Sequence, residues 1–184
     1  MRWEALFADL EAQVEAAERA DLDAEVRDRT RREAALVRTG DRLAPARGSR
    51  LGVVVLGGGT LHGRLLDTGP DWLLLEEPSG LEALVPLVAV LGVTGRGRDT
   101  AVPGGEGVVE RRLDLRWALR GLARSRAGVQ VVLRDATSLA GTLDRVGSDH
   151  VELAEHGQGE ARRGREVRGV RLVPLTALAL LRQG

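Results

Sequence analysis

The 184-residue chain contains no cysteine, lysine, asparagine, isoleucine or tyrosine, and aromatic residues make up only 2% of it. The absence of cysteine excludes disulfides, thiolate metal sites and cysteine nucleophiles. The absence of lysine excludes a Walker phosphate loop, which needs Lys followed by Ser or Thr, so we expect the three glycines at 57–59 to form a turn. Because aromatics are scarce, the core must be built from Leu, Val and Ala.

Long apolar runs are also missing from the sequence. No apolar stretch approaches the roughly 20 residues of a membrane-spanning helix. Residues 1–20 are rich in acidic residues and lack the apolar run of a signal peptide. We therefore expect a cytoplasmic protein without a membrane partner.

The formal net charge is zero, but the charges are unevenly spread. Residues 51–100 carry three Arg and six acidic residues, whereas residues 101–184 carry fourteen Arg and ten acidic residues. Such asymmetry indicates either an acidic partner for the second half or self-association of opposite patches.

One sequence pattern occurs twice, at residues 53–75 and 131–153, displaced by 78 residues. Each copy ends in a similar tail, VPLVAV at 85–90 and VPLTAL at 173–178, displaced by 88 residues, so the second copy holds ten extra residues around 157–168. A repeat of this length predicts two copies of one small folding unit. The matching residues include Leu61 with Leu139, Gly63 with Gly141, Leu65 with Leu143, Gly69 with Gly147, Asp71 with Asp149 and Leu75 with Leu153.

Two segments show the periodicity of helices. Residues 3–38 contain no Gly or Pro, and their apolar residues from Trp3 to Ala17 follow helical spacing. This pattern predicts one long helix or two in succession, ended by the Gly and Pro residues of 40–48. Residues 111–126 predict a further helix, because their Leu and Ala residues share one face and a Gly follows them.

The repeated segments show the pattern of short strands. Residues 51–92 consist of Val- and Leu-rich runs cut by Gly and Pro, which predicts five short antiparallel strands in a small bent barrel. Gly63 and Gly141 lie mid-strand, where a missing side chain allows sharp bending. We therefore predict a mostly β fold with α-helices: an N-terminal helical segment and linker at 1–48, a first barrel at 49–93, a flexible linker at 94–110, and a second unit at 111–184, made of a helix at 111–126 and a barrel at 128–182.

The strand pattern resembles the Sm1 signature of the Sm-like family, in which alternating apolar residues and a turn precede Leu, then Gly-x-Leu. The resemblance implies two bent five-stranded Sm-like barrels in tandem. Because exposed strand edges are a liability, we expect the barrels to pair by their fourth and fifth strands, within one chain, between chains or both. Other small barrels of the SH3 type are the alternative. The residues that carry the resemblance are Val53, Val55, Leu61, Gly63 and Leu65 in the first copy, and Val131, Leu133, Leu139, Gly141 and Leu143 in the second.

Both copies depart from the family where its members hold uridine-rich RNA. The family pattern has an Asp six residues after the strand Gly and an Asn four residues further on. Here Gly69 and Gly147 replace the Asp, and Leu73 and Val151 replace the Asn. The basic pair that precedes the last strand in the family is also replaced by uncharged residues. The usual RNA pocket is therefore expected to be missing from both copies.

Two groups of arginines are candidate binding residues. The first recurs every four residues on the predicted second helix, where it forms one stripe suited to phosphates or carboxylates. Its alternative is an ordinary solvated helix face. Trp117 borders this stripe and either stacks on a base or packs at the domain junction. The second group lies in the insertion of the second copy and is either a basic nucleic-acid contact or a solvated loop. The two groups are Arg112, Arg116, Arg120 and Arg124, and Arg162, Arg163 and Arg165.

Asp71 and Asp149 are equivalent carboxylates that each follow a turn Gly by two residues. They either make a polar contact at the rim of the barrel or cap backbone N–H groups of their own turn. The three histidines do not combine with carboxylates at metal-ligand spacing, and no Ser–His–Asp arrangement has a nucleophile elbow around it. We therefore expect no metal, cofactor, small-molecule substrate or enzymatic activity.

The sequence favours a non-enzymatic interaction or assembly module. Its barrel edges and N-terminal helix would hold protein partners or further copies of the chain, because exposed strand edges readily pair. The alternative is RNA binding through the arginine stripe and the arginine-rich loop, by a route other than the usual Sm pocket.

Overall fold

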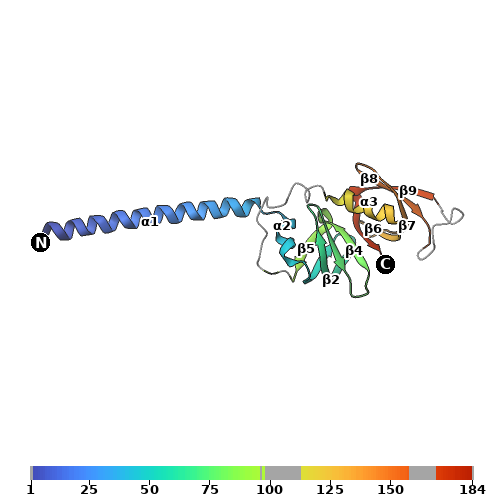
Figure 1. Cartoon of the computed structure of the whole chain (residues 1–184), viewed down its shortest axis with the longest axis horizontal. Helices are drawn as coiled ribbons and strands as arrows, with labels where there is room; N and C mark the ends of the chain where they lie inside the picture. The colour runs from blue at the N-terminus through green and yellow to red at the C-terminus, as the bar shows by residue number, and fades with distance from the viewer. Residues whose placement is uncertain (1, 96, 98–112, 158–168, 184) are drawn as a thin grey trace. The chain divides into compact units, whose positions relative to one another are not determined.

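The computed structural model describes residues 2–95, 97, 113–157 and 169–183. The chain divides into two compact units, Met1–Val37 and Arg38–Gly184. Helix α1 (Arg2–Leu36) makes up almost all of the first unit (Figure 1), so the predicted helical segment forms one long helix and not two in succession. No helix in the described part of the chain is long and apolar enough to cross a membrane.

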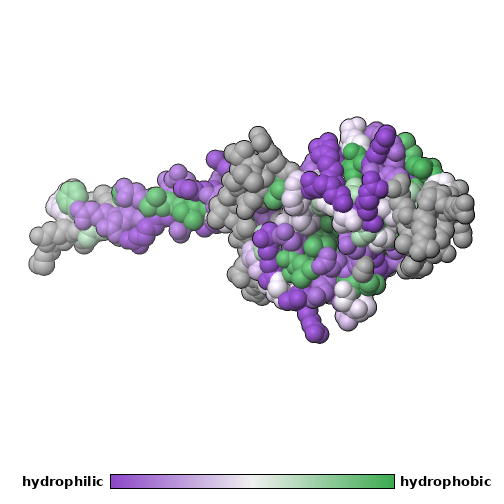
Figure 2. Space-filling view, turned by 45° about the vertical axis from the view of Figure 1, so that its right-hand side comes forward, coloured by the Kyte–Doolittle hydropathy of each residue, from purple (hydrophilic) through white to green (hydrophobic). Residues whose placement is uncertain are grey.

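Helix α1 has a mainly polar surface. Ion pairs between residues four apart, Arg19 with Glu15 and Arg29 with Glu33, lie along it and stabilise a helix modestly. Among its apolar residues, the side chains of Trp3 and Phe7 are exposed. Apolar atoms form separate patches between hydrophilic ones on the face of the helix seen in Figure 2. The helix thus exposes separate apolar side chains and no continuous apolar stripe on that face.

The second unit is built on one ten-stranded antiparallel sheet, in the order β5-β1-β2-β3-β4-β10-β6-β7-β8-β9. The first five strands are β1 (Arg50–Val55), β2 (Gly59–Thr68), β3 (Trp72–Glu76), β4 (Glu82–Pro86) and β5 (Val90–Thr94). The second five are β6 (Gly128–Leu133), β7 (Ser138–Val146), β8 (His150–Glu155), β9 (Gly169–Pro174) and β10 (Leu178–Gln183). Each half therefore repeats the same strand order, as the sequence repeat predicts.

Short helices connect and cover these strands. Helix α2 (Thr39–Leu43) and the 3-10 turn η1 (Ala44–Ala46) precede the first half, within the segment that the sequence suggested as a linker. Leu43 and Ala46 are buried in the first core. Helix α3 (Leu115–Ser125) precedes the second half and packs beside β7 (Figure 1). The 3-10 turns η2 (Leu87–Ala89) and η4 (Leu175–Ala177) join the last two strands of each half.

The two halves do not close into separate barrels, contrary to the sequence prediction. In the first half β5 lies at the outer edge beside β1, and β4 pairs with β10 of the second half. Because β10 occupies the free edge of β4, that edge is unavailable to β5, and the ten strands form one continuous sheet. The predicted pairing of a fourth strand with a fifth strand thus occurs between the two halves of one chain.

Gly63 and Gly141 occupy equivalent places in the two halves, opposite Leu51 on β1 and Val129 on β6. A Cβ atom on Gly63 would lie 2.6 Å from the carbonyl oxygen of Glu76, and one on Gly141 would lie 2.2 Å from the carbonyl oxygen of the facing strand. The close approach of the next strand therefore requires glycine at both positions. This reason differs from the sharp bending that the sequence suggested, which stays a prediction.

The sheet encloses two apolar cores, and each core contains side chains from both halves. The core of the first half includes Val132 and Leu180 from the second half. The core of the second half includes Trp72 and Leu84 from the first half. Neither core is therefore complete without residues from the other half.

Candidate functional site

The two halves meet at a junction formed by β4 and β10. Leu84 pairs with Leu181, and both side chains are buried, at 5% and 1% exposure. Beside this ladder the Arg182 guanidinium donates to both carboxylate oxygens of Glu77, at 2.8 and 3.3 Å. This ion pair is mostly shielded from water, so its two hydrogen bonds specify how the edges meet.

Asp71 and Trp72 fix the segment that leads into α3. The Leu115 backbone N–H donates to Asp71 Oδ1 at 2.7 Å, and Trp72 Nε1–H donates to the Leu113 carbonyl at 2.7 Å. Asp71 therefore contributes to the cap of a helix in the other half, in addition to the Asp114 side chain, which accepts from the Trp117 N–H. Neither of the two roles predicted for Asp71 from the sequence included a contact with α3.

The carboxylates at the start of α3 lie in opposing electrostatic environments. Burial raises the pKa of Asp71, and the nearby Asp114 adds to that effect although the Leu115 N–H opposes it. Burial also pushes the pKa of Asp114 upward, but the Trp117 N–H and the Arg116 guanidinium together hold it below its usual value. Asp71 is thus the carboxylate for which ionisation is costly in the folded chain.

The glycine turn between β1 and β2 lies against the second half. Gly57 has φ +74°, and a Cβ there would lie 2.4 Å from the Leu133 carbonyl oxygen. A Cβ on Gly58 would lie 2.5 Å from the Leu180 side chain. The turn is therefore glycine-rich because its backbone touches the neighbouring half, which agrees with its assignment as a turn and not a phosphate loop.

The outer edges of the sheet are β5 and β9, and neither has a second strand partner within the described residues. Both edges expose apolar side chains, Leu91 on β5 and Val170 and Leu172 on β9. Leu172 occupies the place of Leu84 in the repeat, yet it is 60% exposed whereas Leu84 is 5% exposed. An uncovered edge of this kind invites pairing with another chain.

Asp149 and His150 occupy the places of Asp71 and Trp72 in the second half, at the outer edge. The Asp149 side chain is 85% exposed and pairs with His150 at 2.8 Å. The hydrogen bond with His150 lowers the pKa of Asp149. The two equivalent carboxylates therefore differ: one holds a helix, whereas the other faces solvent.

The exposed face of α3 carries the described part of the predicted arginine stripe. Arg116 forms an ion pair with Asp114 at 2.6 Å. Arg120 and Arg124 are exposed, and Trp117, which precedes both on α3, is 46% exposed. Base stacking, a partner contact and packing at the junction all stay predictions for Trp117. Four further predicted contacts lie outside the described residues, namely Arg112, Arg162, Arg163 and Arg165.

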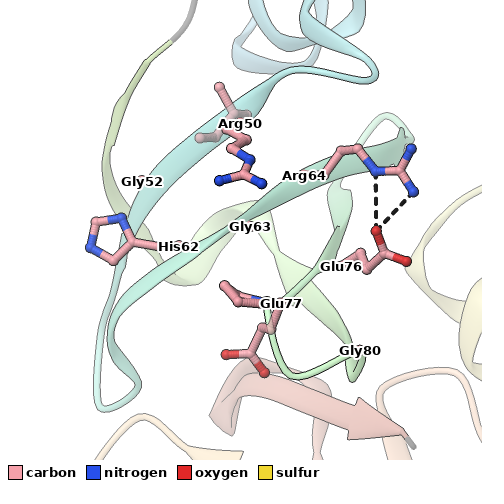
Figure 3. A pocket seen from close by; sticks show the side chains of 10 residues that line it. Arg50, Gly52, His62, Gly63, Arg64, Glu76, Glu77 and Gly80 are labelled. Atoms are coloured by element: carbon pink, nitrogen blue, oxygen red, sulfur yellow. Dashed lines mark hydrogen bonds and ion pairs between the residues drawn. The ribbon is translucent and has the colours of Figure 1, made fainter.

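A cavity of about 620 Å³ opens at the start of β1, in the first half (Figure 3). Arg50, His62 and Arg64 line it together with Glu76 and Glu77. Sequence reasoning did not single out these residues, because they belong to no motif. The signal was their departure from the repeat, since the matching positions of the second copy are mostly small or uncharged.

The third histidine, His156, has structural partners. His156 is buried and shares hydrogen bonds with the Thr142 hydroxyl at 2.8 Å and the Gly157 carbonyl at 3.0 Å. The described part of the chain brings together no group of three or more His, Asp or Glu side chains that could hold a metal ion.

No protein-family model matches the sequence, and no curated protein matches it.

Proposed function

We propose that the chain is a non-enzymatic assembly module whose copies join head to tail, with β9 of one chain pairing with β5 of the next. The observation that carries this proposal is the β4–β10 junction inside each chain. In the repeat, β9 corresponds to β4 and β5 corresponds to β10. The two outer edges are therefore the same kinds of edge that already pair in the middle of the sheet.

The internal junction specifies the register of the proposed external one. Leu84 faces Leu181 and Ala83 faces Arg182 at the internal junction. Transferred through the 88-residue displacement of the tails, the same register pairs Leu172 with Val93 and Arg171 with Thr94. Burial of the exposed Leu172 side chain supports association, because covering a Leu side chain contributes about 1.5–3 kcal/mol.

The repeated strand order and the glycines at 63 and 141 support assigning both halves to a diverged Sm-like fold. This assignment explains why the fourth and fifth strands of one half do not pair with each other. The fourth strand of one half pairs instead with the fifth strand of a neighbouring half. Helix α1 offers a second contact, since it exposes Trp3 and Phe7. Protein partners of this module are accordingly further copies of the same chain.

Two complementary variants test the head-to-tail arrangement. Leu172→Arg places a charge on β9 and leaves β5 intact, whereas Leu91→Arg places a charge on β5 and leaves β9 intact. Both residues are exposed in the single chain, at 60% and 63%, so neither variant should disturb its fold. Light scattering after size exclusion should give assemblies for the natural chain and single chains for each variant.

A mixture of the two variants gives the decisive result. Each variant keeps the edge that the other has lost, so head-to-tail pairing predicts a one-to-one complex that cannot grow further. Leu22→Arg in α1 is the matched control, since Leu22 is 61% exposed but lies on no sheet edge. A natural chain that is a single copy at all concentrations would refute the proposal, and so would assembly of Leu172→Arg alone.

RNA binding through α3 is a second candidate function. Arg120 and Arg124 have no carboxylate partner among the described residues, and Trp117 beside them exposes a face on which a base can stack. Fluorescence anisotropy with uridine- and adenine-rich RNA should show binding that weakens steeply as salt rises. Loss of that binding in Trp117→Ala and Arg120→Ala would support this function, and no binding at low salt would exclude it.

A further inference from the structure

The cavity at the start of β1 contains an unusual pair of like charges. Arg50 on β1 lies directly opposite Arg64 on β2 in the strand register. Like charges that face each other across an antiparallel pair destabilise a sheet. Arg64 is compensated, because its Nε and Nη2 atoms both donate to Glu76 Oε2, at 3.1 and 2.8 Å. Arg50 has no carboxylate partner in the described part of the chain and points into the cavity (Figure 3).

The carboxylates of the cavity are already engaged by other groups. Glu76 accepts from Arg64, and Glu77 accepts from Arg182 at the junction between the halves. The charge left uncompensated on the lining is therefore positive, from Arg50. Arg64 also has donors to spare, because a guanidinium carries five N–H groups and the bonds to Glu76 use two of them.

The second half of the chain shows that the fold does not require this cluster. The same register there pairs Gly128 with Thr142 and Gln130 with Ala140, in place of Arg50 with Arg64 and Gly52 with His62. Ala154 stands where Glu76 would be. The second copy keeps a glutamate at the place of Glu77, namely Glu155, but it has small or uncharged side chains where the first copy has Arg50, His62, Arg64 and Glu76.

We propose that this cavity binds a phosphate-class oxyanion, with Arg50 as its main donor and with Arg64 and His62 beside it. A guanidinium offers paired N–H donors that match the spacing of phosphate oxygens. The cavity volume of about 620 Å³ exceeds what one phosphate needs, so an organic phosphate monoester fits it as well as the free ion.

Titration of the full chain with inorganic phosphate at low salt tests the site, by calorimetry and by amide chemical shifts. We expect saturable binding with a Kd of about 1 mM or tighter, and shifts that centre on β1 and β2. Arg50→Ala should weaken binding roughly tenfold or more, since it removes a charge-assisted donor. Arg145→Ala is the matched control, because Arg145 is an exposed strand arginine of the second half away from the cavity.

The source of the phosphate group is distinguished by a parallel titration with glycerol phosphate. Tighter binding of the monoester than of inorganic phosphate supports an organic ligand, whereas equal binding supports the free ion. Leu172→Arg should bind phosphate as the natural chain does, because the whole site lies within one chain, so the result is independent of assembly. No saturation up to about 10 mM phosphate would overturn the proposal, as would equal losses in Arg50→Ala and Arg145→Ala.

Discussion

Replacement of Asp71 by Ala tests whether the two halves are held together by specific polar contacts as well as by the sheet. The substitution removes the acceptor for the Leu115 N–H, which it receives at 2.7 Å, and leaves that N–H at the start of α3 without its partner. The Asp114 cap of the same helix is unaffected, since it binds the Trp117 N–H. The fall in the free energy of unfolding should therefore measure the contribution of this contact between the halves.

The expected loss of stability is the contribution of the Asp71 hydrogen bond and helix cap, reduced by the cost of burying the carboxylate. A hydrogen bond to a charged group contributes about 1.5–3 kcal/mol, and removal of a helix-capping side chain costs about 0.5–2 kcal/mol. Burial of the Asp71 carboxylate offsets part of this gain, as its raised pKa indicates. We expect Asp71→Ala to lower the free energy of unfolding by about 1.5 kcal/mol. For a unit of this size that corresponds to a fall in Tm of roughly 3–6 °C.

Urea denaturation and thermal melting of three variants measure the effect. Asp149→Ala is the matched control, because Asp149 is the repeat equivalent and is exposed, and its midpoint should stay that of the natural chain. Asp71→Asn keeps an oxygen acceptor for the Leu115 N–H but removes the charge. At low pH the natural Asp71 is protonated and carries no charge either, so the stability of Asp71→Asn should be close to that of the natural chain and above that of Asp71→Ala.

The dependence on pH provides a second readout for Asp71. Its folded pKa lies above the usual value of 3.8, so the folded chain binds this proton more tightly than the unfolded chain does. The contribution to stability is then fully present below pH 3.8 and is lost as the pH rises through the folded pKa. The natural chain should lose stability relative to Asp71→Asn over this range. The reasoning is refuted if Asp149→Ala is as destabilising as Asp71→Ala, or if the pH trend has the opposite sign.

Two further pairs of substitutions test other parts of the sheet by the same urea midpoints. Gly141→Ala places a Cβ 2.2 Å from a carbonyl oxygen of the facing strand and should cost more than about 2 kcal/mol. Gly128→Ala, where the Cβ meets open space, should be nearly neutral, and equal effects of the two would contradict the close-approach argument. Arg182→Ala leaves the shielded Glu77 carboxylate unpaired and should cost about 1–3 kcal/mol. Arg64→Ala breaks a more exposed pair and should cost less; a larger loss there would argue against shielding as the cause.

The sequence predicted the repeated unit well because its signal is periodic and local. The spacing of Gly63 and Gly141 marked the same strand position in both copies, and the structure places both against a neighbouring carbonyl. The helix at 111–126 was found from its apolar face and its following Gly, and α3 spans Leu115–Ser125. The arginines of this helix were expected on its polar face, where Arg120 and Arg124 are exposed.

The sequence could not show how the halves join, because edge pairing depends on backbone groups that every strand has. Barrel closure was predicted from strand count, yet β4 pairs with β10 and leaves the halves open. The contact of Asp71 with Leu115 joins residues 44 apart in sequence, so no local pattern announces it. The cavity around Arg50 was missed for a different reason: only comparison of the two copies at each position shows that its charges are additions to the shared fold.

The exchange of side chains between the two cores has a consequence for cutting the chain. A fragment ending after β5 would expose Trp72 and Leu84 and would lack Val132 and Leu180 from its own interior. A fragment beginning at α3 would have the reciprocal defects. Neither fragment should therefore fold stably alone, although the sequence repeat makes the cut look natural. Mixed together, the two fragments should recover native structure by complementation, since the missing β10 edge and the missing side chains arrive in a single docking step.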